Sequence, residues 1–372
     1  MKHATDKKVP VDKPLNPFTT QYYPLAQPIT ATRAILIGRT TLEETNRLQH
    51  NDEYLLDCYP GQAGDFLCDP HLGRLPYLTV APDINHIRVA VKHSPFTLNS
   101  ALDTLCRNTH EALSAYYRQC GMLYQPESLV RACAWQHSRD KVLTVEQVNY
   151  TEAAATNLIA DLELSAAFSL NPSLGTPTLR SYDATCADHH GKCPSFERSR
   201  LANPIGVAGL GVTADNRLVL SHRSHRVSTY TGMLGPSASG YVAWKDAAKA
   251  DGTPLDALLL TALKREIHEE LLLDPEGETT SYQSLGFYRE LYRAGLPQGF
   301  YRFRIELTAQ ALITRLKEAA APEFSGLLFI DYNEKTAKGD CPLPFGNERL
   351  HDLQLGLEAR ALLSLFERSN TI

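Results

Sequence analysis

Residues 264–273 have the sequence KREIHEELLL, and this stretch decides how the chain is interpreted. On an α-helix, Glu266, Glu269 and Glu270 would project within an arc of roughly 100°. Carboxylates this close repel one another, whereas a hard divalent cation between them would make the arrangement attractive. The stretch alone is equally compatible with an exposed helix face that carries an ordinary Glu-Glu pair.

The residues on either side of this stretch predict the helix that contains it. Thr253 offers an N-cap, Pro254 suits the first helical position, and Asp256 places an acid in the first turn. The dipeptide Asp274-Pro275 should end the helix, because a residue that precedes proline avoids the α conformation. The buried face would consist of apolar residues at helical spacing: Leu255, Leu258, Leu259, Ala262, Ile267 and Leu271.

The elements around the helix follow a definite order. A loop rich in glycine and serine lies upstream of the helix, within 232–240. Two strands joined by a turn precede this loop, and two more follow the helix. These four strands are predicted at 205–212, 217–220, 284–291 and 299–307.

This combination resembles the Nudix hydrolase family, whose signature is G-x5-E-x7-R-E-U-x-E-E-x-G-U, with U a bulky aliphatic residue. The first half of the signature is degenerate, because Asp251 replaces the glycine and Ala257 replaces the glutamate. Leu272 replaces the late glycine and resists the backbone conformation that glycine permits. The second half is matched by Arg265, Glu266, Ile267, Glu269, Glu270 and Leu273.

The resemblance implies an α/β fold, the Nudix α/β/α sandwich with a mixed sheet. It also implies metal-dependent hydrolysis of a nucleoside diphosphate linked to another group, with Mg²⁺ or Mn²⁺ bound by Glu266, Glu269 and Glu270. Glu266 would be a metal ligand or the base for water, and Arg265 would orient a glutamate. The alternative is a Nudix fold that binds a nucleotide without hydrolysing it, because Leu272 would displace Glu270.

Several shorter segments resemble one branch of the family, the UDP-sugar diphosphatases. This second resemblance implies cleavage of a nucleotide sugar such as UDP-glucose into a nucleoside monophosphate and a sugar 1-phosphate. ADP-ribose or a dinucleotide is the alternative substrate within the same enzyme class. The segments that carry the resemblance lie at 150–157, 202–207, 213–215, 223–224 and 285–286.

Six residues outside the acidic stretch are predicted to bind substrate. The two arginines among them that follow a strand suit phosphate recognition, although a solvated strand end would have the same sequence. The serine and glycine offer backbone N–H groups to phosphate or metal, unless they form a plain loop. The last two flank the turn of the second hairpin, where Nudix proteins often place substrate contacts. The six are Arg223, Arg226, Ser239, Gly240, Glu290 and Arg293.

Three further features have a simpler explanation than a functional one. Phe300 and Tyr301 could stack on a base, but aromatic residues in strands more often belong to the core. Glu323 could supply an additional carboxylate. The run CADHHGKC at 186–193 could bind zinc, but structural zinc sites usually have a second cysteine pair, so a polar loop between domains is favoured.

The composition excludes several other classes of protein. The chain has 372 residues, a length that suits two domains. Its net charge is −5, and it lacks the basic stripe that binding to a nucleic-acid polymer would need. Eight scattered cysteines, no signal peptide and no long apolar run predict a cytoplasmic protein without a membrane span. A small-molecule nucleotide is the expected partner, and a homodimer is left open.

Four segments are predicted along the chain. Residues 1–29 would form an extended tail, 30–171 an N-terminal α/β domain of unknown role, and 172–200 a linker. Residues 201–372 would form the Nudix-like domain, with a closing helix at 348–368. Within the N-terminal domain a helix is expected at 98–120, and strands at 34–37, 53–58, 75–80, 87–91 and within 129–148.

Overall fold

The structure is a computed structural model that describes most of the chain from residue 51 onward. Arg226 and Glu323, two residues considered above, lie outside the described part. The described residues are 21–24, 36–37, 40–41, 51–62, 64–70, 72–119, 127–136, 141–161, 178–224, 230, 232–318, 324–331 and 354–371.

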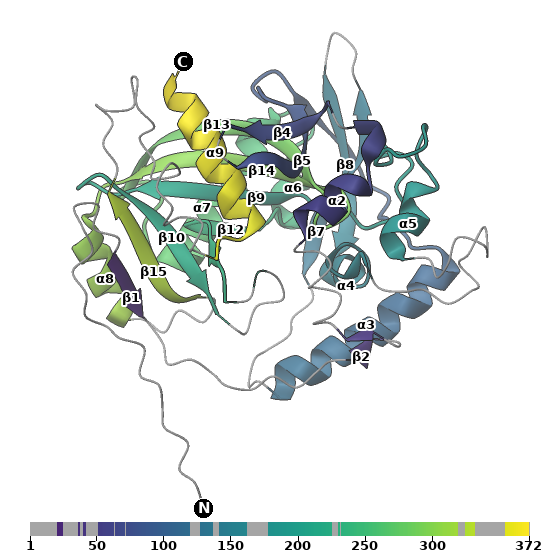
Figure 1. Cartoon of the computed structure of the whole chain (residues 1–372), viewed down its shortest axis with the longest axis horizontal. Helices are drawn as coiled ribbons and strands as arrows, with labels where there is room; N and C mark the ends of the chain where they lie inside the picture. The colour runs from purple at the N-terminus through teal and green to yellow at the C-terminus, as the bar shows by residue number, and fades with distance from the viewer. Residues whose placement is uncertain are drawn as a thin grey trace, which may run out of the picture.

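A mixed sheet of ten strands forms the centre of the molecule (Figure 1). Its main path has the order β1-β15-β10-β9-β14-β13-β5-β4, while β11 pairs with β10 and β12 pairs with β9. Neighbouring strands are antiparallel, except that β9 and β14 are parallel. The strands are β1 (Gln21–Pro24), β4 (Phe66–Asp69), β5 (Gly73–Ala81), β9 (Gly206–Val212), β10 (Arg217–Arg223), β11 (Leu234–Gly235), β12 (Ala238–Tyr241), β13 (Thr279–Glu290), β14 (Leu296–Ile305) and β15 (Phe324–Asp331).

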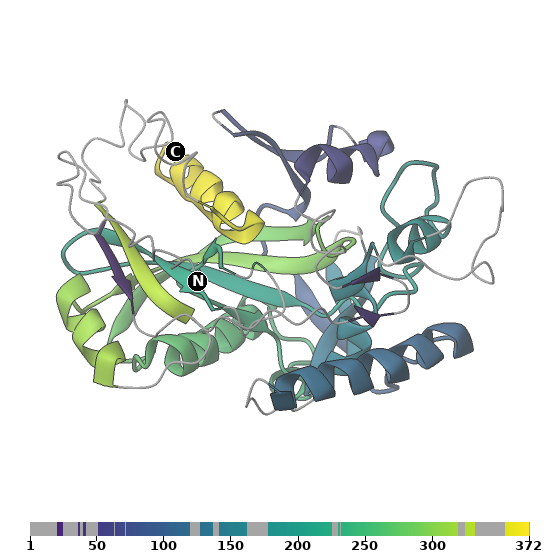
Figure 2. The same ribbon diagram turned by 60° about the horizontal axis from the view of Figure 1, so that its bottom comes forward.

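Helices cover both faces of this sheet (Figure 2). One face packs against α7 (Leu255–Leu271) and α8 (Ala309–Glu318), and the other packs against α9 (Leu357–Thr371). Alternation along β9 divides its side chains between the two cores, since Val207 lies on the α7 side and Ala208 on the α9 side. These three layers confirm the predicted α/β class with a mixed sheet and helices on both faces.

Glycines in the sheet allow α7 to pack closely against it. A Cβ placed on Gly209 would lie 2.9 Å from the side chain of Leu263, and one placed on Gly299 would lie 2.8 Å from Leu259. Real Cβ atoms do not approach other heavy atoms this closely, so a side chain at either position would have to displace the end of a leucine of α7. The two glycines therefore allow these leucines to pack directly on the sheet.

The ends of α7 differ slightly from the prediction. Pro254 is the N-cap residue, one position after the predicted Thr253. The helix ends at Leu271, before Asp274, because Leu272 adopts the left-handed conformation with φ 54° and ψ 32°. Its backbone N–H donates to the carbonyl of His268, 3.1 Å away. Leu272 thus takes the conformation that glycine usually supplies at a helix C-terminus.

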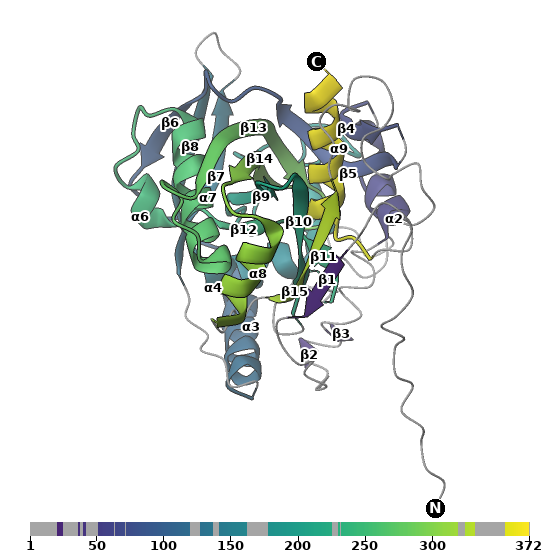
Figure 3. The same cartoon turned by 90° about the vertical axis from the view of Figure 1, so that its left-hand side faces the viewer.

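A second, three-stranded sheet lies beside α7 (Figure 3). Its strands are ordered β6-β8-β7, and β6 runs parallel to β8. Val130 links this sheet to the larger one, because its N–H donates to Val242 and its carbonyl accepts from the N–H of Ile205. The side chains of the small sheet share one apolar core with α7. The strands are β6 (Arg88–Lys92), β7 (Ser128–Gln136) and β8 (Val142–Asn149).

One element of the N-terminal region was predicted wrongly. Residues 53–58 were expected as a strand, but the structure has helix α2 (Asp52–Asp57) there. The side chain of Asn51 accepts the N–H of Tyr54 and caps the helix, and two acids lie in the first turn, where the helix dipole favours them. Capping outweighs the strand pattern because the segment is short and only Leu55 is fully covered.

The N-terminal region also contributes strands to the central sheet. β5 pairs with β13, β4 pairs with β5, and β1 pairs with β15. The predicted helix at 98–120 is α3 (Ser100–Gln119), which lies away from the large sheet (Figures 1 and 2). The four predicted segment boundaries stay a prediction.

The remaining elements are short. The closing helix predicted at 348–368 corresponds to α9, which begins later than predicted, at Leu357, since residues 354–356 are not helical. Within the part of the chain that the structure describes, no helix is long and apolar enough to cross a membrane. The short elements are β2 (Leu36–Ile37), β3 (Thr40–Thr41), η1 (Pro60–Gln62), α4 (Tyr150–Ala154), η2 (Asn157–Ile159), α5 (Leu179–Ala184) and α6 (Trp244–Ala247).

Candidate active site

The acidic end of α7 lies against β12. The carboxyl group of Glu266 covers the Cα atom of Gly240, so a Cβ on residue 240 would overlap all three carboxyl atoms. The backbone N–H of Ser239 donates a hydrogen bond of 2.8 Å to Oε2 of Glu270. The structure therefore brings the predicted Ser239-Gly240 pair into contact with two of the three predicted carboxylates.

The three carboxylates differ in their exposure to solvent. Glu266 and Glu270 are 8% and 7% exposed, whereas the side chain of Glu269 is 54% exposed. A buried carboxylate is costly unless charged partners or hydrogen bonds compensate it. Glu266 and Glu270 are therefore held by their surroundings, while Glu269 is open to a ligand from solvent.

Arg265 provides much of this compensation. Its Nη1 lies 2.7 Å from Oε1 of Glu266 and 3.3 Å from Oε2 of Glu269, and its Nη2 donates to the carbonyl of Tyr241 at 2.7 Å. Burial lowers the pKa of Arg265, but the negative charges of Glu266, Glu269 and Asp246 outweigh burial and raise it. The guanidinium therefore stays charged and fixes the side chains on both sides of it.

Asp246 is a member of this cluster that the sequence did not reveal. It belongs to α6, and its Oδ2 lies 3.7 Å from Nε of Arg265. Nothing in the local sequence marks this residue, because the contact exists only where α6 packs beside α7. The hydrogen bond from Arg265 to the carbonyl of Tyr241 likewise depends on how the elements pack and has no local sequence signal.

The carboxylates at this end of α7 have donor chemistry that suits a divalent cation. Mg²⁺ commonly uses one or two carboxylates together with water and substrate phosphate, and carboxylate oxygens are the ligands it prefers. Among the described residues, no three His, Cys, Asp or Glu side chains converge as a metal-binding group. The donor chemistry fits a cation held by part of the predicted set, and the complete set Glu266, Glu269 and Glu270 stays a prediction.

Arg223 places a positive charge near strand β12. It is the last residue of β10, and its Nη1 lies 3.5 Å from the hydroxyl of Ser239. A guanidinium in this position could meet a phosphate that approaches Glu269 along β12. Arg226, the second predicted arginine, lies outside the described residues.

Glu290 and Arg293 lie in a buried polar network at the turn between β13 and β14. Glu290 is 0% and Arg293 is 5% exposed. Arg293 bonds to both Glu290 and Glu358 of α9, and its Nη2 donates to Gln298 at 2.9 Å. Burial raises the pKa of Glu290, with Glu358 adding to the shift and Arg293 opposing it. The side chains join α9 to the sheet, and a role in substrate binding would require them to be uncovered.

Two segments that resemble the UDP-sugar diphosphatases, 150–157 and 202–207, meet at this turn. Nδ2 of Asn157 donates to Oδ1 of Asn203 at 3.0 Å and to the carbonyl of Arg293 at 2.9 Å. The N–H of Asn203 donates back to Oδ1 of Asn157 at 2.8 Å. Asn203 also has a positive φ of 43°, a conformation that asparagine tolerates better than most residues. These contacts give both segments a structural reason for their sequence.

The remaining candidates are buried or lack a ligand set. Phe300 and Tyr301 are 0% and 1% exposed, so both belong to the core. Cys193 is buried, and burial raises the pKa of its thiol. Within the described ranges, neither the run 186–193 nor any other group of three suitable side chains forms a metal site.

Known proteins give only distant likenesses. No protein-family model matches the chain, and no curated protein matches it in sequence. A bifunctional NMN adenylyltransferase/ADP ribose pyrophosphatase from Francisella tularensis, solved with AMP and a manganese ion, overlaps 73% of this chain and 77% of its own, at 10% identity and a TM-score of 0.30. A Nudix hydrolase from M. smegmatis overlaps 45% of this chain and 84% of its own, at 11% identity and a TM-score of 0.26.

A third solved structure, a protein from Deinococcus radiodurans, overlaps 34% of this chain and 67% of its own, at 16% identity and a TM-score of 0.25. TM-scores this low do not establish a shared fold. The likenesses therefore assign neither a fold nor an activity to this chain.

Proposed function

We propose that this chain is a Nudix-type diphosphatase, a hydrolase that cleaves the acid anhydride of a nucleoside diphosphate linked to a second group. One observation carries the proposal: the end of α7 presents the exposed Glu269 beside two buried carboxylates that Arg265 and β12 hold in place. Buried like charges without such support would be strongly unfavourable, so their retention beside an open carboxylate favours a site for a cation and a phosphate.

The roles follow from the position of each side chain. Glu266, Glu269 and Glu270 would hold Mg²⁺ or Mn²⁺, which when bound neutralises phosphate charge and activates water. Arg265 positions Glu266 and Glu269 through an ion pair with each. Glu266 is also the candidate base for the attacking water. Addition of water to one phosphorus breaks its bond to the bridging oxygen and gives two phosphate monoesters.

We propose a nucleotide sugar such as UDP-glucose as the substrate, with a nucleoside monophosphate and a sugar 1-phosphate as products. This choice rests on the sequence resemblance alone. ADP-ribose or a dinucleotide is the second candidate within the class. A catalytically inactive protein that binds a nucleotide is the alternative outside it, and a homodimer stays a prediction.

The test is hydrolysis of a panel of nucleoside diphosphate sugars, ADP-ribose and dinucleotides, with Mg²⁺ or Mn²⁺ and phosphate-coupled detection. Glu269→Gln keeps the size of the side chain and removes its charge, and we expect it to abolish turnover. Glu276→Gln is the matched control, because Glu276 is 75% exposed and forms an ion pair with Lys264 at the surface. Metal-independent turnover, or equal loss in both variants, would contradict the proposed site.

Absence of turnover across the panel, in protein with a cooperative unfolding transition, would favour the inactive nucleotide-binding alternative. Equilibrium binding of the same nucleotides to the wild type would then decide between that alternative and a different function. Retention of nucleotide affinity in Glu269→Gln without catalysis would separate binding from chemistry.

A further inference from the structure

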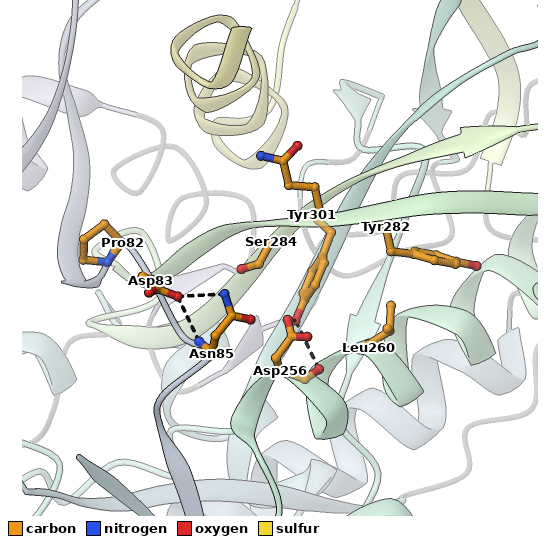
Figure 4. A pocket seen from close by; sticks show the side chains of 9 residues that line it. Pro82, Asp83, Asn85, Asp256, Leu260, Tyr282, Ser284 and Tyr301 are labelled. Atoms are coloured by element: carbon orange, nitrogen blue, oxygen red, sulfur yellow. Dashed lines mark hydrogen bonds between the residues drawn. The ribbon is translucent and has the colours of Figure 1, made fainter. Parts of the chain in front are cut away.

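A cavity lies at the opposite end of α7 from the carboxylates. It has a volume of about 380 Å³, within the range of small-molecule sites. Its wall comes from three parts of the chain: the segment after β5, the first turns of α7, and strands β13 and β14 (Figure 4). The lining residues are Pro82, Asp83, Asn85, Asp256, Leu260, Tyr282, Gln283, Ser284 and Tyr301.

A buried phenol positions the carboxylate in this cavity. Tyr301 is 1% exposed, and its hydroxyl donates to Oδ1 of Asp256 at 2.8 Å (Figure 4). Burial raises the pKa of Tyr301 far above its usual value, and the charge of Asp256 raises it further, so the phenol remains a donor. The orientation of Asp256 is therefore set by the core and not by solvent.

The lining holds two carboxylates, Asp83 and Asp256, beside the polar side chains of Asn85, Gln283 and Ser284. Oδ1 of Asp83 accepts both the backbone N–H and the Nδ2 of Asn85, which directs the amide donors of Asn85 toward Asp83. The hydroxyl of Ser284 accepts the N–H of Gly286 at 3.2 Å. None of the nine lining residues is Lys, Arg or His. A primary ammonium group, with three donors, a positive charge and no acceptor, matches such a lining.

An aromatic ring completes this chemistry. The ring of Tyr282 is fixed because its hydroxyl donates to the carbonyl of Pro275 at 3.0 Å. The ammonium of Lys264, which pairs with Glu276, lies 5.2 Å from the ring centroid, a distance at which a cation interacts favourably with an aromatic face. A ligand that brings an ammonium group to Asp256 can place its apolar part against Tyr282 and Leu260.

The cavity is separate from the proposed hydrolytic site. Asp256 and Glu266 are ten residues apart on one helix, which corresponds to about 15 Å along its axis. Glu266 faces β12, whereas Asp256 faces Tyr301 of β14. The diphosphate of a nucleotide would also be repelled by the two aspartates of the lining, so this cavity does not suit the proposed substrate.

We propose that this cavity binds a small polar molecule through a primary ammonium group, with Asp256 as its main partner. The proposal does not depend on the hydrolase activity. The segment after β5 would then form one wall of a ligand site, and the first turns of α7 would form another. An amino sugar is of a suitable size and combines an ammonium with hydroxyl groups for Asn85 and Ser284.

Calorimetric titration of the full chain with glucosamine tests the proposal, at a slightly acidic pH where the amine is protonated. Glucose, nearly the same shape without the charge, is the matched ligand, and we expect it to bind at least about tenfold more weakly. Asp256→Asn can still accept from Tyr301, so its fold should persist, and we expect it to weaken glucosamine binding by about tenfold. Asp57→Asn, at the exposed end of α2, should leave binding unchanged.

A second variant tests the cavity itself. Leu260→Trp keeps every charge of the lining but fills part of the space, and we expect it to abolish glucosamine binding. Equal affinity for glucose and glucosamine, or wild-type binding in Asp256→Asn or Leu260→Trp, would overturn the proposal. Putrescine, a small diamine, is a second ammonium probe. Failure of the wild type to bind either glucosamine or putrescine at millimolar concentration would overturn the proposal as well, whatever the outcome for hydrolysis.

Discussion

The acidic end of α7 and the turn between β13 and β14 each pair one arginine with two glutamates, yet they differ in what reaches solvent. At the turn, Arg293 is enclosed by Glu290 and Glu358, and all three are at most 5% exposed. On α7, Arg265 is shared with Glu269, whose side chain is 54% exposed. The first arrangement is closed, whereas the second leaves a charge available to a ligand.

Tyr241 connects the two regions. Its carbonyl accepts from Arg265 at 2.7 Å, and its hydroxyl accepts from Arg293 at 3.2 Å. The comparison shows that an acid near an arginine does not by itself identify a site, because the same pair can join two elements of the fold. Exposure of one carboxylate, supported by buried neighbours, is what distinguishes the α7 end.

Removal of the buried arginine at the turn should have the largest effect. Arg293→Met would leave Glu290 and Glu358 without their shared counter-charge, and we expect a loss of about 3–5 kcal/mol in the free energy of unfolding. Urea denaturation measures this loss. Arg302→Met on β14, where Arg302 is partly exposed and bonds to Gln283, should cost less than about 1 kcal/mol.

A small loss of stability in Arg293→Met would contradict the view that the turn is a closed structural network. If Arg293→Met costs no more than Arg302→Met and instead raises KM, Arg293 contacts substrate as the sequence suggested. The turn would then belong to the active site, and α9 would have to move away from it when substrate binds.

A methyl group on β12 should act mainly on activity. In Gly240→Ala the new Cβ would displace the Glu266 carboxyl group, which lies at the far end of its side chain. We therefore expect kcat/KM to fall about a hundredfold, and the free energy of unfolding to fall by only about 1 kcal/mol. Gly64→Ala is the control, since a Cβ there meets nothing within 4 Å. Unchanged activity in Gly240→Ala would show that the position of Glu266 is not critical.

The sequence predicted the elements whose signals are local. The helix containing Glu266 and the strands around it were found because apolar spacing and turn residues are read within one segment. The contact of Glu266 with Gly240 was not predictable, since it depends on where β12 lies relative to α7. The partnership of Arg293 with Glu358 joins residues that are far apart in the chain, and no local pattern reports it.

Competition between local signals explains the error at α2. Residues 53–58 have a strand-like pattern, but the hydrogen bond from Tyr54 N–H to the side chain of Asn51 starts a helix. The pairing of β5 with β13 is equally non-local, so the sequence did not show that N-terminal residues extend the central sheet. Both cases show that the sequence predicted the helix of the candidate site more accurately than the N-terminal elements around it.

The end of α7 provides a third, smaller test of how the site is held. Leu272 has a φ of 54°, a conformation that costs a residue with a Cβ about 1–2 kcal/mol relative to glycine. Leu272→Gly removes both the strain and the side chain, whereas Leu272→Ala removes most of the side chain and keeps the strain. We expect the glycine variant to be more stable than the alanine variant by about 1 kcal/mol in urea denaturation. Equal stability of the two would show that the backbone relaxes at this position.

An ion pair beyond the end of α7 should have the smallest effect, and one that depends on pH. Hydrogen bonds from Arg315 and from the N–H of Asp274 lower the pKa of Glu278 to about 2. A lowered pKa in the folded state stabilises the protein above the ordinary value of 4.5, and this contribution disappears as the pH falls from 4.5 to about 2. For a partly exposed pair we expect less than about 1 kcal/mol. Glu278→Gln should therefore be less stable than the wild type at neutral pH and equal to it in acid, whereas a constant difference at every pH would show that packing, and not charge, is responsible.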